Sequence, residues 1–276
     1  MKKIFALSLI IMSLTAHAQS IKVMTYNIRY DNENDGENIW NNRKAKVAKL
    51  IEFYAPAVFG TQEGLVHQLD YLDESLKSYK YIGVGRDDGK KKGEFSAIFY
   101  NSTDYDIVEN SDFWLSETPE KVSVGWDASM ERICSYALFK NKKSGKTFWV
   151  FNAHFDHRGV EARKQSAQLI LDMIDKKTRN MKLPVVLMGD LNLGPEEEPI
   201  KIISSKMDDT RLASETEPYG PSGTFNRFDK NFIMNLRIDY IFTKNFKVKT
   251  YAQIADRLDN NNYPSDHIPV LTELAF

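Results

Sequence analysis

The apolar residues of this chain fall into short runs separated by turn-forming residues. Nine runs, many of them rich in Val, Ile, Phe and Tyr, are bounded by Gly, Asn, Asp or Pro, a pattern typical of β-strands. These runs are residues 21–26, 57–61, 79–83, 95–100, 133–139, 147–152, 185–189, 238–242 and 269–274. Helical spacing of apolar residues occurs instead in residues 40–54, from residue 65 to 72, and in residues 160–174. Many strands and few helices predict two packed sheets with the helices outside.

The N-terminus has a different pattern and must be separated from the fold. Lys2 and Lys3 precede the apolar residues 4–14, and Ala16, His17 and Ala18 form a small-x-small cleavage site. This pattern predicts a secretory signal peptide over residues 1–18, since its apolar part is too short to span a bilayer. The alternative is a buried first helix. For a bacterial protein we expect a periplasmic or secreted location, with one domain over residues 19–276 and no transmembrane segment.

Composition narrows the class of partner. Removing residues 1–18 leaves 35 basic against 38 acidic residues, a net charge of −3. Dedicated nucleic-acid binders usually carry a basic excess, so we expect no dedicated nucleic-acid-binding module. We expect a monomer. The single cysteine, Cys134, excludes an internal disulfide and lies in an apolar run, where core packing is the common fate.

Polar residues stand at the ends of six of the predicted strands. A lone acid at a strand end is usually a turn former or a cap, but six ends carrying Asn, Glu, His or Asp indicate one site at a sheet rim. The residues are Asn27, Glu63, His154, Asp190, Asp239 and the pair Asp266 and His267.

These residue types suit metal-assisted hydrolysis of a phosphate ester. Carboxylate oxygens of Glu63 and Asp266 are ligands that Mg²⁺ prefers. A histidine polarised by a carboxylate can deprotonate water, and His267 with Asp239 or Asp266 fits that role. Asp190 and Asn192 would orient the water and a phosphoryl oxygen. His154 would donate a hydrogen bond to the transition state.

The chain resembles the endonuclease/exonuclease/phosphatase superfamily, which includes DNase I. Six motifs carry the resemblance in order: TYNIR (25–29), TQEG (61–64), NAHFDH (152–157), GDLN (189–192), RIDYIF (237–242) and SDH (265–267). The resemblance implies an α+β fold, a four-layered αββα sandwich of two mixed, mostly antiparallel sheets flanked by helices. It also implies a Mg²⁺ site at one rim, where Mn²⁺ or Ca²⁺ can substitute, with Asn27 beside Glu63 and Asp266. The motifs are most similar to a bacterial, often secreted branch.

A second group of residues is assigned to the substrate. Arg132 resembles the phosphate-contacting arginine of DNase I-like members, and His157 follows the catalytic His154. Arginines can grip a second anionic group, although surface ion pairs are an equally common role for them. The further candidates for the substrate pocket are Arg29, Arg86, Arg158 and Asn226.

Four functions remain open at this point. The first is a secreted Mg²⁺-dependent phosphodiesterase or phosphatase that acts on a small or lipid-derived phosphate ester. The second is a DNase I-like nuclease. The third is a zinc hydrolase, because residues 154–157 match half of an H-x-H-x-D-H motif, although Asn152 stands where a His is needed. The fourth is a catalytically inactive binding module on the same fold.

Overall fold

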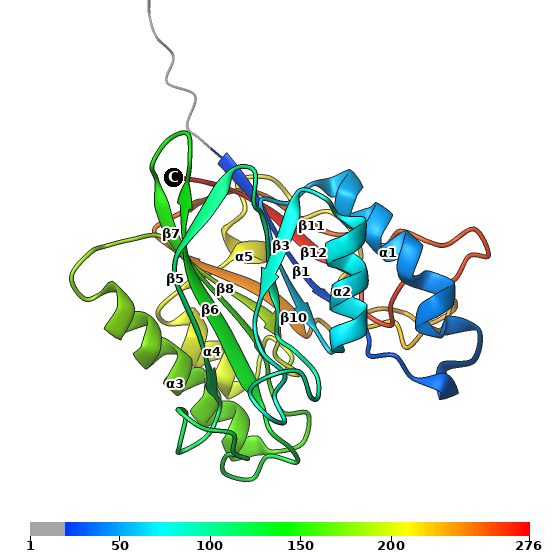
Figure 1. Cartoon of the computed structure of the whole chain (residues 1–276), viewed down its shortest axis with the longest axis horizontal. Coiled ribbons are helices and arrows are strands. Elements are labelled where there is room, and N and C mark those ends of the chain that lie inside the picture. Colours follow the sequence, from blue (N-terminus) through cyan, green and yellow to red (C-terminus); the bar gives the residue numbers. More distant parts are fainter. Residues whose placement is uncertain (1–19) are drawn as a thin grey trace, which may run out of the picture.

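Two six-stranded β-sheets form the centre of the protein (Figure 1). The computed structural model describes residues 20–276, so the expected signal peptide, residues 1–18, lies outside the described residues. The first sheet has the order β11-β12-β1-β2-β4-β3: Lys247–Gln253, Val270–Ala275, Ser20–Asn27, Val58–Gln62, Ile98–Asn101 and Tyr79–Ile82. The second has the order β5-β6-β7-β8-β10-β9: Tyr105–Trp114, Ile133–Asn141, Thr147–His154, Val185–Asp190, Asp239–Lys244 and Asp208–Asp209.

Helices cover the outer face of each sheet (Figure 1). Helices α1 (Trp40–Tyr54) and α2 (Val66–Ser75) pack on the first sheet, and α3 (Val160–Thr178) and α4 (Glu198–Ser204) pack on the second. The buried apolar side chains of the described residues form three cores, one under each helix layer and one between the sheets. The predicted four-layered αββα sandwich is therefore confirmed. In residues 20–276, no helix combines the length and apolar character needed to cross a bilayer.

The structure contains elements that the apolar pattern did not predict. Strand β5 is missed because its middle residues are exposed and polar, as expected for the edge of a sheet. Strand β11 alternates lysines with apolar residues, and β9 has only two residues. The short helices α4, α5 (Thr210–Ala213) and the 3-10 helix η1 (Glu33–Asn38) have too few turns to show a period.

Strand register brings the motif-bearing strand ends together. β1 and β2 are parallel, with Asn27 opposite Gln62, so Asn27 and Glu63 emerge at the same rim. In the other sheet β7 and β8 are parallel, and His154 lies opposite Asp190. β10 runs antiparallel to β8 and begins at Asp239, also opposite Asp190. Parallel neighbours and reversed strand starts thus direct side chains from both sheets to one end of the sandwich.

Close packing between strands fixes this end of β8. Gly189 has a φ of 151°, and a Cβ there would lie 1.9 Å from the carbonyl oxygen of Ala153 on β7. Only glycine tolerates this conformation and approach. The glycine of the GDLN motif therefore sets the position of Asp190 beside His154.

Candidate active site

A cavity of ≈ 680 Å³ opens at the rim where the strand ends meet. Its wall contains Glu63 and Asp266 from the first sheet and His154, Asp190 and Asn192 from the second. His267 also lines it, and Asp239 lies fully buried beneath that histidine. The structure therefore brings together the catalytic and metal residues predicted from six separate segments.

An asparagine joins the carboxylates of the two sheets. The Asn27 amide nitrogen donates to Glu63 Oε1 at 3.0 Å and to Asp190 Oδ2 at 2.9 Å. One oxygen or nitrogen from each of Glu63, His154 and Asp190 lies within 4.8 Å of the others. This group offers ligand atoms from both sheets around a space the size of a cation site.

A buried aspartate fixes the orientation of His267. The Nδ1 atom of His267 lies 2.8 Å from Asp239 Oδ2. The Nε2 atom of the same ring therefore faces Asp190 Oδ2, at 3.7 Å. The ring of Phe225, 4.9 Å away between centroids, packs on the imidazole. Asp239, rather than Asp266, is therefore the carboxylate partner of His267.

His154 approaches Asp190 from the other side. Its Nε2 lies 3.7 Å from Asp190 Oδ2 and 3.1 Å from the Asn192 amide nitrogen, which also donates to the carbonyl of Phe155 at 3.0 Å. The backbone N–H of Asn192 donates to Asp190 Oδ1 at 3.0 Å. Both oxygens of Asp190 are thus held by amides, one from each sheet.

Three residues at this rim have left-handed backbone conformations. Arg29, Glu63 and Asn192 have φ angles of 57°, 64° and 53°. Such values are uncommon for residues with a Cβ and cluster at functional sites, where the surrounding structure holds the strain. Each follows a strand closely and turns its side chain back toward the cavity.

Burial and charge change the proton affinity of the site. Burial, with the neighbouring charge of Asp239, raises the pKa of Asp190 to about 7. Burial, with the charge of Glu63, raises the pKa of Asp266 to about 6. Burial alone would lower the pKa of His267, but the charges of Asp239 and Asp190 outweigh it and raise that pKa well above its usual value.

The residues present fit a hard divalent cation. Oxygen donors dominate the cavity floor, which is the ligand type that Mg²⁺, Mn²⁺ and Ca²⁺ bind. The raised pKa values of Asp190 and Asp266 show buried negative charge that a cation would offset. In the described part of the chain, Asp239 Oδ1 is also buried without a hydrogen-bond partner. Glu63, Asp190, Asn27 and Asp266 can therefore hold a metal ion.

The opposite wall of the cavity is cationic. Arg86 binds Glu94 through two hydrogen bonds of 2.8 and 2.9 Å. Arg132, largely buried, lies 3.4 Å from Asp156 and 3.1 Å from His157 Nδ1. Arg86, Arg132 and His157 all line the cavity. Arg29 lines it as well, so four of the six predicted substrate residues face the same space.

Burial and this cationic wall also act on His154. Burial and the positive charges of Arg132 and Arg86 lower its pKa well below the usual value. His154 is therefore a neutral imidazole at physiological pH. Its Nδ1 lies 3.8 Å from Glu94 Oε2, which links the cationic wall to the catalytic centre.

Two predicted substrate residues lie elsewhere. Arg158 is exposed and does not line the cavity, because the loop after β7 turns it outward. Asn226 is fully buried behind the wall, where its amide donates to the carbonyl of Ser265 at 2.9 Å and its backbone N–H donates to the carbonyl of Asp266 at 2.7 Å. Asn226 thus supports the SDH motif from behind instead of facing the substrate space.

Sequence reasoning also missed residues that the structure places in the wall. Glu94 and Tyr30 line the cavity, as do Met130, Leu236 and Ile238. Glu94 follows a run of lysines and glycines and directly precedes the predicted strand over residues 95–100, so its place before that strand was the available signal. Tyr30 directly follows the TYNIR motif, so its position beside a site residue was the one available signal.

The half-matched zinc motif does not form a ligand cluster. Asn152 lies between the sheets, accepting from Gln62 at 2.6 Å and donating to the carbonyls of Thr61 and Ala97. Asp156 accepts from the backbone N–H groups of Arg158 and Gly159. Both side chains are committed to holding the fold.

Comparison with known proteins identifies the family. The profile of the Endonuclease/Exonuclease/phosphatase family matches residues 24–267. The chain belongs to this family. Its fold and the order of its motifs are therefore those of the DNase I-like superfamily, as the sequence predicted.

Solved structures of bacterial members are similar over nearly the whole chain. A family protein from Bacteroides thetaiotaomicron is 42% identical, with a TM-score of 0.91, over 94% of this chain and 95% of that one. A mannosyl-6-phosphatase from the same organism is also 42% identical, with a TM-score of 0.90, over 93% of this chain and 100% of that one. An uncharacterized protein from Acanthamoeba polyphaga mimivirus is 28% identical over 84% of this chain and 91% of its own length.

Proposed function

We propose that this chain is a secreted, Mg²⁺-dependent phosphatase that hydrolyses the phosphate ester of a small polar substrate such as a phosphorylated sugar. The observation that carries the proposal is the Asp239–His267 pair, which faces Asp190, Glu63 and His154 in one cavity. Members of the family include hydrolases of phosphate esters, and the site retains each side chain that such chemistry requires.

The side chains suggest a division of labour. When bound beside Glu63, Asn27 and Asp190, Mg²⁺ would neutralise charge on the phosphoryl oxygens. His267, oriented by Asp239, would accept the proton of the attacking water through Nε2. Since carboxylates raise its pKa, the neutral imidazole forms only where positive charge offsets Asp190 and Asp239.

Residues of the second sheet would stabilise the transition state. His154 and the amide of Asn192 lie next to each other at the floor of the cavity, where both can bind a phosphoryl oxygen. Because the Asn192 amide nitrogen donates to Nε2, the single ring N–H of a neutral His154 is on Nδ1, and this N–H would be the donor to the substrate.

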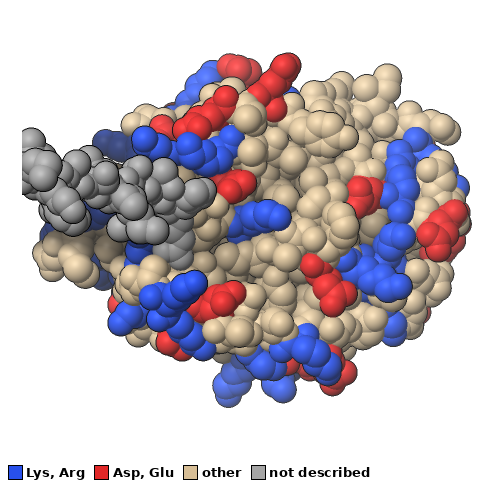
Figure 2. All heavy atoms as spheres, turned by 90° about the horizontal axis from the view of Figure 1, so that it is seen from above, with Lys and Arg blue, Asp and Glu red and all other residues tan. Residues whose placement is uncertain are grey.

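The proposed substrate class rests on the cationic wall and on one relative. Arg86, Arg132 and His157 close the cavity opposite the carboxylates, which favours a compact polar substrate. The mannosyl-6-phosphatase shares 42% of its sequence with this chain. Figure 2 shows Lys and Arg intermingled with Asp and Glu on the face at which β1 begins, whereas the cavity lies at the other end of this strand.

The proposed export depends on residues 1–18. Their charged start, apolar stretch and Ala18 cleavage site favour a periplasmic or secreted mature protein. N-terminal sequencing of the protein recovered from a periplasmic extract or culture medium tests this part. A chain that begins at Met1 in the cell pellet would contradict it.

A substrate panel tests the activity. Residues 19–276 would be assayed with mannose 6-phosphate, bis-p-nitrophenyl phosphate and plasmid DNA, with Mg²⁺ or with EDTA. We expect release of inorganic phosphate from the monoester, dependent on Mg²⁺ and absent in His267→Ala. Faster cleavage of plasmid DNA would favour the nuclease, and turnover of none of these substrates would favour the inactive binding module.

A further inference from the structure

A buried arginine lies behind the rim of the active site. Arg43 belongs to the first turn of α1 and is 1% exposed, and it does not line the cavity. Burying a charged group is costly unless hydrogen bonds replace the water that it loses. The hydrogen bonds of this guanidinium therefore indicate its role.

Within residues 20–276, all hydrogen bonds of the guanidinium go to backbone carbonyls. The Arg43 Nε donates to the carbonyl of Asn38 at 2.9 Å, and Nη2 donates to that of Arg29 at 2.8 Å. Nη1 donates to the carbonyl of Ile28 at 2.5 Å and to that of Pro264 at 3.2 Å. Arg43 thus joins three segments of the chain: the end of η1, the residues after β1 and the loop before β12.

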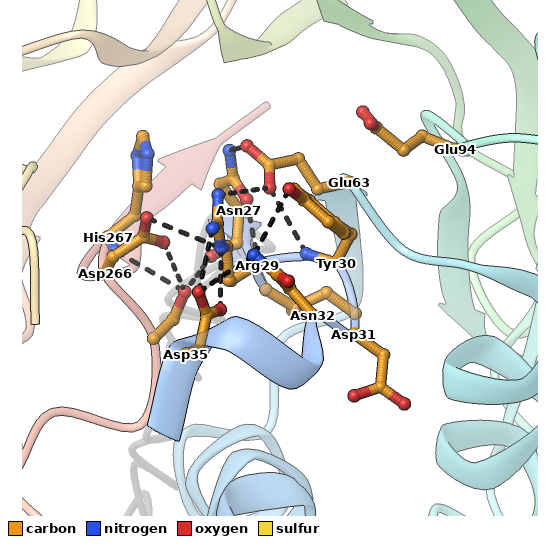
Figure 3. A network of polar contacts seen from close by, with 12 residues as sticks. Asn27, Arg29, Tyr30, Asp31, Asn32, Asp35, Glu63, Glu94, Asp266 and His267 are labelled. Atoms are coloured by element: carbon orange, nitrogen blue, oxygen red, sulfur yellow. Dashed lines mark hydrogen bonds and ion pairs between the residues drawn. The ribbon is translucent and has the colours of Figure 1, made fainter. Parts of the chain in front are cut away.

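Two of these segments carry active-site side chains, which lie beside one another in Figure 3. One segment begins directly after Asn27, and the other leads into Asp266 and His267. The hydroxyl of Ser265 links the same two segments by donating to the carbonyl of Asn27 at 2.7 Å. Arg43 and Ser265 therefore set where the SDH motif lies relative to the end of β1.

The loop before β12 depends on such links for its position. Residues 254–269 lie between β11 and β12, and their one β-bridge joins His267 to Phe225. The ring nitrogens of His267 must nevertheless meet Asp239 at 2.8 Å and Asp190 at 3.7 Å, both on the other sheet. A displacement of about 1 Å would disturb both contacts, and errors of this size can cost ~10²-fold in rate.

The geometry of these contacts is specific to arginine. A planar guanidinium directs five N–H groups outward in fixed directions, whereas lysine offers a single nitrogen. The rings of Trp40 and Phe228 flank the guanidinium, with centroids 5.0 and 5.7 Å from its Cζ. Arginine at this position can therefore reach all three segments at once.

We propose that Arg43 is a positioning residue for hydrolysis, because it ties the loop that carries Asp266 and His267 to the end of β1 and so keeps His267 facing Asp190. Arg43 acts through His267 and does not contact the substrate. The kinetic part of this inference rests on the proposed function, whereas the position of His267 can be measured without a substrate.

Nuclear magnetic resonance of labelled histidine rings tests the position directly. The ring signal of His267 in residues 19–276 would be identified by its loss in His267→Ala. We expect this signal to shift in Arg43→Met, while the signal of the exposed His67 stays unchanged. Leu50→Ala is the matched control, because it removes buried packing from the same helix and no hydrogen bond. In this control the His267 signal should keep its place.

Steady-state kinetics test the consequence for the reaction, with the folded fraction measured by circular dichroism. Per folded molecule, Arg43→Met should lower kcat by about 10²-fold. KM should change by less than about 2-fold, because Arg86 and Arg132 stay in place. Arg43→Lys should restore part of kcat, since its ammonium keeps the charge and can still reach some of the carbonyls. Leu50→Ala should keep the wild-type kcat per folded molecule.

The outcomes separate positioning from stability. A wild-type His267 signal or a wild-type kcat in folded Arg43→Met would overturn the inference, as would an equal loss of kcat in Leu50→Ala. If Arg43→Met does not fold, a shifted His267 signal in Arg43→Lys supports the inference and an unshifted one overturns it. Failure of both variants to fold would assign Arg43 to the fold as a whole and also overturn it. If the wild type hydrolyses no phosphate ester, the proposed function fails, and the His267 signal still decides this inference.

Discussion

Two arginine–carboxylate pairs stand at opposite ends of the cavity and differ in what lies beyond them. Arg29 binds Asp35 and turns its remaining edge to Glu63 and Asp266. Arg86 binds Glu94, whose carboxylate lies 3.8 Å from His154. Both pairs are bidentate, through Nε and Nη2 in Arg29 and through Nη1 and Nη2 in Arg86.

Surroundings decide what each pair can do. At the first end the guanidinium faces anionic side chains and acts as a fixed positive charge. At the second end the carboxylate faces a histidine, while Arg132 adds positive charge that a substrate anion can use. The same kind of ion pair therefore faces carboxylates in one place and a histidine in the other.

The largest effect on activity is expected from replacing His267, which lines the cavity between the two arginine–carboxylate pairs. His267→Ala should lower phosphoesterase turnover by at least ~10²-fold, the scale of lost general-base catalysis. His67→Ala is the matched control, because His67 is exposed and pairs with Asp31 at 2.9 Å, away from the cavity. Rates of phosphate release measure both variants. Near wild-type turnover in His267→Ala would place the chemistry elsewhere.

Replacing Arg86 tests whether the two arginine–carboxylate pairs have different roles. Arg86→Met should raise KM by roughly 10-fold, as expected for a lost charge-assisted hydrogen bond. Steady-state kinetics on the best monoester would measure the change. An unaltered KM would show that Arg86 does not contact the substrate.

The stability of the protein should depend on pH through two buried carboxyl groups, those of Asp190 and Asp266. Asp190 and Asp266 have raised pKa values of about 7 and about 6, so the folded protein binds more protons than the unfolded chain between about pH 4 and pH 7. Their contribution to stability is therefore present at low pH and is lost as pH rises through that window. With EDTA, Tm should fall by at least about 2 °C between pH 5 and pH 7.5, since ~1 kcal/mol shifts Tm by about 2–4 °C in a domain of this size.

Calorimetry on the Asp190→Asn variant tests whether Asp190 causes the fall in Tm. In Asp190→Asn the fall in Tm between the two pH values should be smaller, because the amide cannot ionise. Adding Mg²⁺ to the wild type at pH 7.5 should raise Tm by mass action. An equal fall in the variant would attribute the trend to other groups.

The smallest effect is expected outside the cavity. Arg158→Ala should change kcat/KM by less than about 2-fold, because Arg158 is exposed and its side chain does not line the cavity. A loss close to that of Arg86→Met would extend the substrate site beyond the cavity wall. Steady-state kinetics of Arg158→Ala and Arg86→Met on the same substrate would resolve the difference.

Sequence patterns predicted the sandwich better than they predicted the wall of the site. Apolar runs identified both central strands of each sheet because those strands are buried on both faces. Strand β5 escaped because an edge strand needs little apolar surface. Asn27, Glu63 and Asp190 could be predicted as site residues, because a polar residue at the end of a buried strand can be recognised from the local sequence alone.

Residues in loops gave weaker signals. Asp35 lies in a polar stretch, and Glu94 precedes a predicted strand instead of following one, yet each binds an arginine at the cavity. Asn226 and Arg158 carried residue types suited to a substrate pocket, but the chain turns one inward and the other outward. A side chain's direction in a loop depends on contacts with distant segments, which no local pattern contains.

The sequence by itself determined the layers, the family and the residue types available for metal and phosphate chemistry, because burial and strand period are local properties of a chain. Only the tertiary structure decided which carboxylate orients His267 and which side of Glu63 Arg29 occupies. Those choices depend on contacts between different segments of the chain, such as the 2.8 Å contact of His267 with Asp239 and the 4.0 Å contact of Arg29 with Asp266. Coulomb interactions and hydrogen bonds act over such distances in space, whatever the separation along the sequence.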